Sequence, residues 1–320
     1  MKKILKFLGI ILGIVLLAVL GFVTFIEVRG LPSYEAKVPD IKQVEVTPQR
    51  VARGEKLASM LCFNCHYNGE TGKFTGRALA EVPQFGAINS RNITQDKENG
   101  IGKWTDAQLI YFLRTGIHPF RQKYIPPYMV KLAHISDEDM YSIVAFLHSD
   151  DPRLQASNIA LPQSEPSFLT KFLCFVAFKP FPFPEKVIAD PDTNNAVEWG
   201  KYIALNQVEC FSCHSKDFKT NDYFNPEKSE GFFGGGNIIL DPEGKKMVSL
   251  NLTQDEETGL GKWSEEDFTK ALRTGVVPGG LPPLRNPMIP FPRFTDNEVK
   301  AIWAYLKSVP KLKHKVERAG

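Results

Sequence analysis

Two short stretches of the chain each bring two cysteines and a histidine together. They read CFNCH and CFSCH, and their residues are Cys62, Cys65 and His66 in the first and Cys210, Cys213 and His214 in the second. Two cysteines separated by two residues serve three chemistries in proteins: thiol–disulfide exchange, structural zinc binding and covalent attachment of haem.

The histidine that follows each pair favours the third chemistry. Two thiols at this spacing can bond to the two vinyl groups on one edge of a porphyrin, and the adjacent histidine then lies under the iron. A zinc site built from the four cysteines would leave both histidines without a role, and a thioredoxin-like pair needs a βαβ context that this chain does not show. We therefore expect two covalently attached haem c groups, with His66 and His214 as iron ligands.

The second axial ligand of each iron should recur at a constant offset if the two sites are duplicates. In the first half, only Met129 has a counterpart at the offset that relates the two copies, namely Met288, and both lie in proline-rich loops. We expect these methionines to be the ligands, and bis-histidine ligation through His118 or His134 is the alternative. His/Met ligation raises the potential of haem iron and fills both axial positions, which favours electron transfer over substrate chemistry.

The repeat extends well beyond the cysteines. Residues 92–104 and 251–263 are identical at nine of thirteen positions, at an offset of 159 in the numbering. The offset between the cysteine motifs is only 148, so the second copy holds eleven extra residues, which we place in the glycine-rich stretch 231–248 as a turn between two short strands. Each copy predicts three helices: one before the cysteines, one that starts at Thr105 or Ser264 with Gln108 or Asp267 three residues on and ends at Arg-Thr-Gly, and one at the end of the copy. In the last helix, apolar residues recur at i, i+3, i+4 and i+7, starting from Met140 in the first copy and from Val299 in the second, which predicts one buried face.

Two further residues of each copy, a tryptophan just before the second helix and an arginine near the end of that helix, could contact haem. Trp104 and Trp263 could pack in the core or donate an indole N–H to a haem propionate. Arg114 and Arg273 could bind propionates, or they could simply be cations near a helix C-terminus. The fifth cysteine, Cys174, lies in an apolar segment and is expected to be a buried, inert thiol.

The N-terminus predicts a membrane anchor. Phe7 to Ile26 form an uncharged apolar run long enough to cross a bilayer as a helix. A cleaved signal peptide, which has a shorter apolar region, is the alternative. Lys2, Lys3 and Lys6 place the N-terminus in the cytoplasm by the positive-inside rule. The net charge of +3 is small and gives no basis for nucleic-acid binding.

The expected fold is all-α, with two tandem haem domains behind one transmembrane helix. The expected segments are a cytoplasmic tip and anchor at 1–27, a stalk at 28–45, domain one at 46–150, a packed Pro/Phe-rich linker at 151–190, domain two at 191–310 and a basic tail at 311–320.

These motifs resemble class I c-type cytochrome domains. The resemblance rests on CxxCH, the N-[IL]-T-Q-D block that ends in G-K-W, the Arg-Thr-Gly stop and the Pro/Met loop, and it covers both domains. It is closest to membrane-anchored dihaem and multihaem cytochromes, including the cytochrome subunits of periplasmic alcohol and aldehyde dehydrogenases, which usually carry three haems.

The resemblance implies a bacterial inner-membrane protein with its haem domains in the periplasm. It would relay single electrons from a quinol-oxidising complex or a periplasmic dehydrogenase towards a terminal oxidase, alone or as a subunit of a respiratory complex, without catalytic residues of its own. The alternatives are a dihaem peroxidase-type enzyme and a cytochrome subunit of a periplasmic dehydrogenase.

Overall fold

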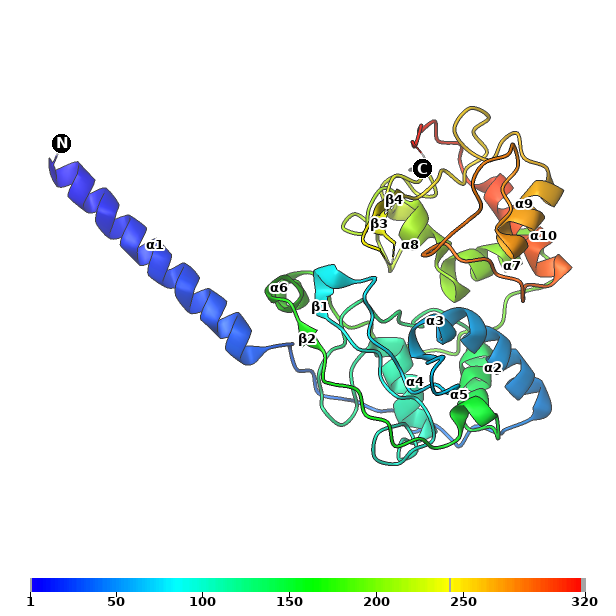
Figure 1. Cartoon of the computed structure of the whole chain (residues 1–320), viewed down its shortest axis with the longest axis horizontal. Coiled ribbons are helices and arrows are strands. Elements are labelled where there is room, and N and C mark those ends of the chain that lie inside the picture. The colour runs from blue at the N-terminus through cyan, green and yellow to red at the C-terminus, as the bar shows by residue number, and fades with distance from the viewer. Residues whose placement is uncertain (1, 242, 318–320) are drawn as a thin grey trace.

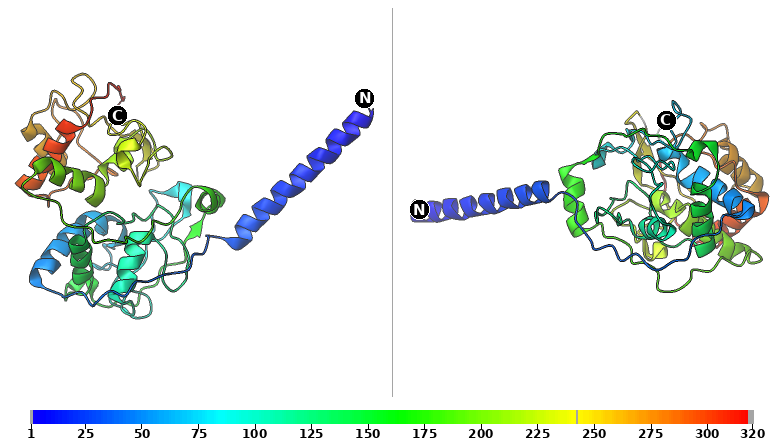
Figure 2. Two further views of the ribbon diagram at one scale, coloured as in Figure 1. Left: turned by 180° about the vertical axis from the view of Figure 1, so that it is seen from behind. Right: turned by 90° about the horizontal axis from the view of Figure 1, so that it is seen from below.

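Helix α1 (Lys2–Arg29) projects from a body of two lobes in the computed structural model (Figure 1). The structure describes residues 2–241 and 243–317. Met1, Pro242 of the predicted turn and the end of the predicted basic tail lie outside the described residues. Two views from other directions show α1 extending away from the lobes (Figure 2).

Within the described residues, each lobe is built from four α-helices. Those of the N-terminal lobe are α2 (Pro48–Leu61), α3 (Phe63–His66), α4 (Asp106–Thr115) and α5 (Asp137–Leu147). Those of the C-terminal lobe are α7 (Ala196–Tyr202), α8 (Cys210–His214), α9 (Glu265–Thr274) and α10 (Asp296–Ser308). Helix α6 (Phe168–Val176) lies in the connection between the lobes.

Short antiparallel strand pairs complete the fold. Strand β1 (Gly86–Ala87) pairs with β2 (Glu165–Pro166), which fixes the linker to the N-terminal lobe. Strand β3 (Ile238–Leu240) pairs with β4 (Lys246–Val248), with Ile238 opposite Val248.

The repeated helices begin and end as their sequences predict. Thr105 and Gln108 form a capping box at the start of α4, and Ser264 and Asp267 form one at the start of α9. Both helices end at a glycine in the left-handed conformation. Because a left-handed backbone costs glycine little, the Arg-Thr-Gly sequence stops both helices at the same place.

The first and last helices of each lobe cross at a glycine. A Cβ atom on Gly54 of α2 would lie 1.8 Å from the carbonyl oxygen of Ser142 in α5, and a Cβ on Gly200 of α7 would lie 1.8 Å from that of Ala301 in α10. The two backbones are therefore in direct contact. Ser142 and Ala301 are related by the offset of the sequence repeat, so both crossings have the same geometry.

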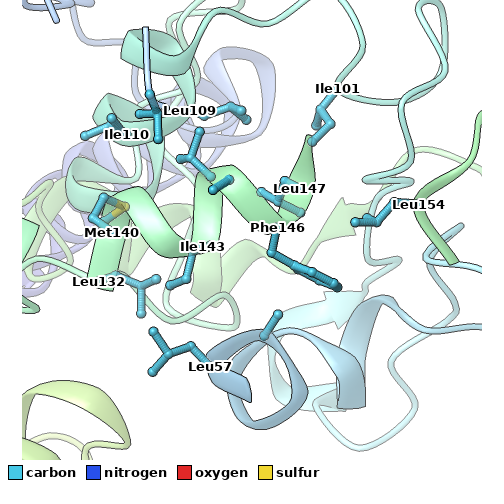
Figure 3. Packing of buried hydrophobic residues seen from close by; sticks show 14 of the residues in the cluster. Leu57, Ile101, Leu109, Ile110, Leu132, Met140, Ile143, Phe146, Leu147 and Leu154 are labelled. Carbon is cyan, nitrogen blue, oxygen red and sulfur yellow. The ribbon is translucent and has the colours of Figure 1, made fainter. Parts of the chain in front are cut away.

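The last helix of each lobe carries the core. In the N-terminal lobe, Met140, Ile143 and Phe146 of α5 are buried against Leu57 and residues from the loops (Figure 3). In the C-terminal lobe, Val299, Ile302 and Tyr305 of α10 take the equivalent places. The periodic apolar residues of α5 and of α10 therefore face the core of their own lobe, and each lobe has a separate core.

The C-terminal lobe accommodates extra residues in two places. The first place lies between Gly200 and Cys210, a stretch that is longer by two than the one between Gly54 and Cys62. Here Ile203–Gln207 form a π-helical turn, η3. A π-turn is a common way for a helix to absorb such an insertion.

The second insertion holds the eleven extra residues, and its position differs from the prediction. These residues do not form the hairpin within 231–248. Gly76 donates to the carbonyl of His66, and Gly235 donates to that of His214, with both N–O distances at 2.8 Å. Gly76 and Gly235 are already related by the offset of 159, so the insertion lies between His214 and Gly235. The β3–β4 hairpin corresponds to a similar stretch of the N-terminal lobe, where Leu79 donates to the carbonyl of Ile88.

The lobes face each other through equivalent contacts. Tyr202 of α7 donates to Asp139 at the start of α5 at 2.5 Å, and Lys56 of α2 donates to Glu298 at the start of α10 at 2.5 Å. Each donor stands at the second position after its crossing glycine, and the two carboxylates are related by the repeat offset. The interface therefore has approximate two-fold character, like that of an isologous dimer.

Candidate functional site

The two motif histidines are held by identical hydrogen bonds. Nδ1 of His66 lies 2.7 Å from the carbonyl oxygen of Arg91, and Nδ1 of His214 lies 2.8 Å from that of Leu250. Because a carbonyl oxygen only accepts, Nδ1 carries the proton in both rings, and Nε2 keeps a free lone pair. Burial lowers the pKa of both imidazoles, so both are neutral. This is the state in which histidine binds a metal ion.

The four motif cysteines lie in or next to the short helices α3 and α8, and no disulfide joins them. Cys62 lies where α2 gives way to α3, and Cys210 begins α8. Burial raises the pKa of Cys62 and of Cys210 to about 12. Thiol–disulfide catalysts need a lowered thiol pKa, so these pairs are unsuited to that chemistry.

Met129 and Met288 lie in loops that are closed by backbone hydrogen bonds at equivalent positions in the two lobes. The first loop is closed by bonds from Ile125 to Gly116 and from Leu132 to Leu113, at 2.9 and 2.8 Å. The second is closed by bonds from Leu284 to Gly275 and from Phe291 to Leu272, both at 2.7 Å. Since both bonds of the first loop recur in the second loop at the offset of 159, the two methionines are structurally equivalent.

An arginine clamps the chain that follows each methionine. Nη1 of Arg114 donates to the carbonyls of Ala133 and Ile135 at 3.1 Å, and Nη2 donates to Asp137 at 2.6 Å. Arg273 bonds to the equivalent carbonyl of Phe294 and to Asp296, both at 2.6 Å. The structure thus shows the arginines positioning the methionine loops, while their contact with propionates stays a prediction.

The two tryptophans pack beside the cores. Trp104 makes edge contacts with Phe112, His118 and Phe120, at centroid separations of 5.0 to 5.4 Å. Trp263 packs against the core of the C-terminal lobe. Both side chains are part-buried, and propionate binding by their indole N–H groups stays a prediction.

The alternative histidine ligands have other partners. Nε2 of His134 lies 3.2 Å from the carbonyl of Tyr223 in the C-terminal lobe, so this ring joins the two lobes. Nδ1 of His118 accepts from the backbone N–H groups of Phe120 and Arg121 at 3.3 Å. The second lobe cannot repeat either contact, because Arg293 and Val277 stand at the matching positions.

The asparagine of each N-[IL]-T motif has a structural role beside the site that the sequence did not lead us to expect. Asn92 donates to the carbonyls of Ser157 and Ile159, and Asn251 donates to that of Leu312, at 2.7 to 2.9 Å. Both asparagines therefore hold the segment that follows the last helix against the loop behind the histidine. The repeated motif itself is the signal that could have identified them.

The cysteines and histidines do not form a zinc site. In the part of the chain that the structure describes, no three His, Cys, Asp or Glu side chains gather around one position. Each histidine instead presents one free nitrogen beside a thiol pair, which fits a haem bound through two thioethers and one imidazole.

Comparison with known proteins agrees with this fit. The family model described as Cytochrome c matches residues 51–150. This stretch is a cytochrome c domain. The protein accordingly binds haem c covalently and has a mostly helical fold, and its N-terminal helix α1 is a candidate membrane anchor.

Curated relatives of this chain include subunits of dehydrogenases. It is 29% identical over 277 residues to the cytochrome c subunit of the quinone-dependent alcohol dehydrogenase of Gluconobacter oxydans, covering 81% of this chain and 55% of the relative. It is 27% identical over 277 residues to the fructose dehydrogenase cytochrome subunit of Gluconobacter japonicus, covering 81% and 52%. The chain thus spans about half the length of these relatives.

One relative is closer in length. The chain is 28% identical over 276 residues to a diheme cytochrome c-type protein of Cereibacter sphaeroides, covering 81% of this chain and 86% of the relative. The name of this relative agrees with the two CxxCH motifs of the present chain.

Proposed function

We propose that the chain consists of two tandem class I cytochrome c domains, at residues 46–150 and 191–310, each carrying one haem c. The linker at 151–190 joins them, and the stalk at 28–45 connects the first domain to the anchor at 1–27. The support is the set of contacts that repeat at a constant offset: the glycine crossings, the histidine bonds, the loop closures and the arginine clamps.

The residues that would hold each group follow from the repeat. Cys62 and Cys65 would attach the first haem, and Cys210 and Cys213 the second. His66 with Met129 would bind the first iron, and His214 with Met288 the second. Bound haem c takes up and releases one electron at its iron. The protein orients each imidazole through the carbonyl of Arg91 or Leu250 and holds each methionine in a pinned loop.

We infer that this chain is the cytochrome c partner of a periplasmic dehydrogenase. The relatives named as dehydrogenase subunits support this role over a relay from a quinol-oxidising complex to a terminal oxidase. Helix α1 would hold the protein in the bacterial inner membrane with the haem domains in the periplasm, where electrons released by sugar or alcohol oxidation pass into the respiratory chain.

The observation that carries the haem assignment is the pair of imidazoles with equivalent Nδ1 bonds and free Nε2 atoms. The pyridine haemochrome of the purified protein should give two haems per chain. Met129→Ala and Met288→Ala should each remove about half of the methionine–iron charge-transfer band. Met140→Leu is the matched control, because Met140 is fully buried in the core. An unchanged band in either ligand variant would reject that ligand.

The donor can be tested on isolated membranes. Addition of an alcohol or a sugar acid should reduce the haems faster than a quinol analogue does, and the signal should vanish when the chain is deleted. Faster reduction by the quinol analogue would favour the quinol-oxidising complex instead. Rapid cyanide binding to one haem, together with peroxide-dependent oxidation, would favour the peroxidase alternative.

A further inference from the structure

Helix α6 exposes an apolar face that a soluble surface helix would not have. Its sequence FLTKFLCFV has only two polar residues, Thr170 and Lys171. Leu169 and Val176 are 54% and 55% exposed, and Phe168 is 37% exposed. Surface helices in water place charged and polar residues on such a face, so this one requires a different environment.

The opposite face of α6 is firmly attached to the N-terminal lobe. Thr170 and Cys174 are buried, and the hydroxyl of Thr170 donates to the carbonyl of Phe85 at 3.0 Å. Ser167 caps the helix and its hydroxyl donates to the carbonyl of Gln84 at 3.1 Å. Together with the β1–β2 pair directly before it, these contacts fix α6 to the haem domain as a rigid element.

Helix α6 also contacts the end of α1. The rings of Phe22 and Phe172 lie 6.0 Å apart, as do those of Phe25 and Phe175, and Lys171 forms an ion pair with Glu27. Figure 1 shows α6 beside the point where α1 joins the body, and Figure 2 shows the same from behind.

These contacts set the depth of α6. If α1 spans the bilayer with Phe7 to Ile26, Phe22 lies about 6 Å inside the end of the apolar run, at 1.5 Å per residue. A helix whose rings touch Phe22 and Phe25 lies at the same level. Amphipathic helices that lie in the membrane surface bury their apolar faces to about 5–10 Å, so the two depths agree.

We propose that α6 is an interfacial helix whose Leu169 and Val176 side chains enter the lipid bilayer. It is a second membrane contact, in addition to α1, and it rests on α1 being a membrane span. The bilayer is the expected occupant of the apolar face because this face continues the lipid-facing surface of α1, where Phe22 and Phe25 are also exposed.

A surface pocket beside the end of α1 has the chemistry expected at the boundary between lipid acyl chains and headgroups. It is lined by Phe25, Val28, Arg29, Ser33 and Lys123. Two cations next to two apolar side chains match the transition from acyl chain to phosphate headgroup.

The consequence is a fixed orientation for the first haem domain. Because one end of the domain is attached through both α1 and α6, it cannot turn about the stalk. The same side of the domain would then always face the membrane.

The test uses the full-length haem-loaded chain in phosphatidylcholine nanodiscs. Leu169→Cys and Val176→Cys are labelled separately with an environment-sensitive fluorophore. The motif cysteines are occupied by haem, and Cys174 is fully buried, so the unsubstituted chain reports background labelling. Val187→Cys, at an 80% exposed linker position, is the aqueous control, and Leu20→Cys in α1 is the lipid control.

We expect the labels at 169 and 176 to show blue-shifted emission and quenching by doxyl-lipids within about twofold of the label at position 20. The label at 187 should show neither. Emission at 169 and 176 like that at 187, with the label at 20 still quenched, would overturn the inference and indicate a protein partner for this face. Loss of quenching at position 20 would overturn it too, because its membrane premise would fail. The haem content and charge-transfer bands are independent of both outcomes.

Discussion

The equivalent arginines of the two lobes differ sharply in their surroundings. The side chain of Arg114 is 2% exposed and that of its partner Asp137 is 23% exposed, whereas Arg273 and Asp296 are 25% and 76% exposed. The linker runs past the N-terminal clamp, because the backbone N–H of Asp137 donates to the carbonyl of Ile188 at 2.8 Å. The same motif therefore has a buried version and a surface version within one molecule.

The largest effect should come from removing the buried clamp. Arg114→Ala leaves Asp137 and the carbonyls of Ala133 and Ile135 without their donor, and loss of one partner of a buried pair costs about 3–5 kcal/mol. Arg273→Ala should cost only about 1 kcal/mol, since exposed pairs contribute little. Calorimetric unfolding of both variants measures the difference. Equal losses would show that burial does not distinguish the two clamps.

The interface between the lobes allows a second comparison. Asp139 is buried and accepts hydrogen bonds from Arg53, Tyr202 and Gln207, while Glu298 accepts from Lys56 and caps its own helix. Asp139→Asn should cost about 2–3 kcal/mol, as expected for lost hydrogen bonds to a charged group. Glu298→Gln should cost less. Chemical denaturation monitored at the haem bands gives both values, and a larger loss for Glu298→Gln would contradict the ranking.

The glycine crossings should respond alike if the lobes share their packing. Gly54→Ala and Gly200→Ala each place a methyl group against a backbone carbonyl. The helices must then separate, at a cost of about 1–3 kcal/mol each. Gly9→Ala in α1 is the neutral control, because an added Cβ there would lie more than 4 Å from every other described residue beyond its own helical turns. Thermal unfolding of the three variants tests the equivalence, which unequal shifts for the two crossings would reject.

The smallest effect concerns a surface contact between the lobes. The guanidinium of Arg293 lowers the pKa of Glu55, and burial partly opposes this. A carboxylate with a lowered folded-state pKa stabilises the fold above its unfolded pKa, and this stabilisation disappears as the pH falls through the folded value. Glu55→Gln should therefore lower the unfolding midpoint slightly at neutral pH, and this difference should shrink as the pH falls below the ordinary range of a glutamate. If the difference in unfolding midpoint between Glu55→Gln and the unsubstituted chain grew as the pH fell, the predicted direction of the pH dependence would be wrong.

Much of the fold follows from the repeat in the sequence. The capping boxes, the Arg-Thr-Gly stops and the apolar positions of α5 and α10 depend on local sequence, and the structure has them where the sequence predicts them. Met129 and Met288 can be matched for the same reason, because the loops around them have equal length.

The rest depends on contacts that a single sequence does not display. Sequence reasoning places the insertion too late because its neighbourhood is rich in glycine, although Phe74 and Phe233 already stand at the common offset and are both buried. The carbonyls of Arg91 and Leu250 act through the backbone, so their side chains carry no signal. The pairing of Tyr202 with Asp139 depends on how the lobes dock, which no local pattern specifies.

The stalk has a consequence for how the protein meets its partners. The backbone N–H of Tyr34 donates to the carbonyl of Gln122 at 2.8 Å, and that of Val44 donates to the carboxylate of Asp106 at 2.6 Å. Residues 31–44 therefore run along the N-terminal lobe and do not form a free tether. A flexible linker would let the haem domains sample a wide volume above the membrane. The contacts of residues 31–44 with the N-terminal lobe prevent such movement of the domains. If α1 anchors the chain as proposed and the donor lies in the same membrane, encounters should be set by two-dimensional diffusion, and the rate of electron delivery should scale with the surface density of the donor.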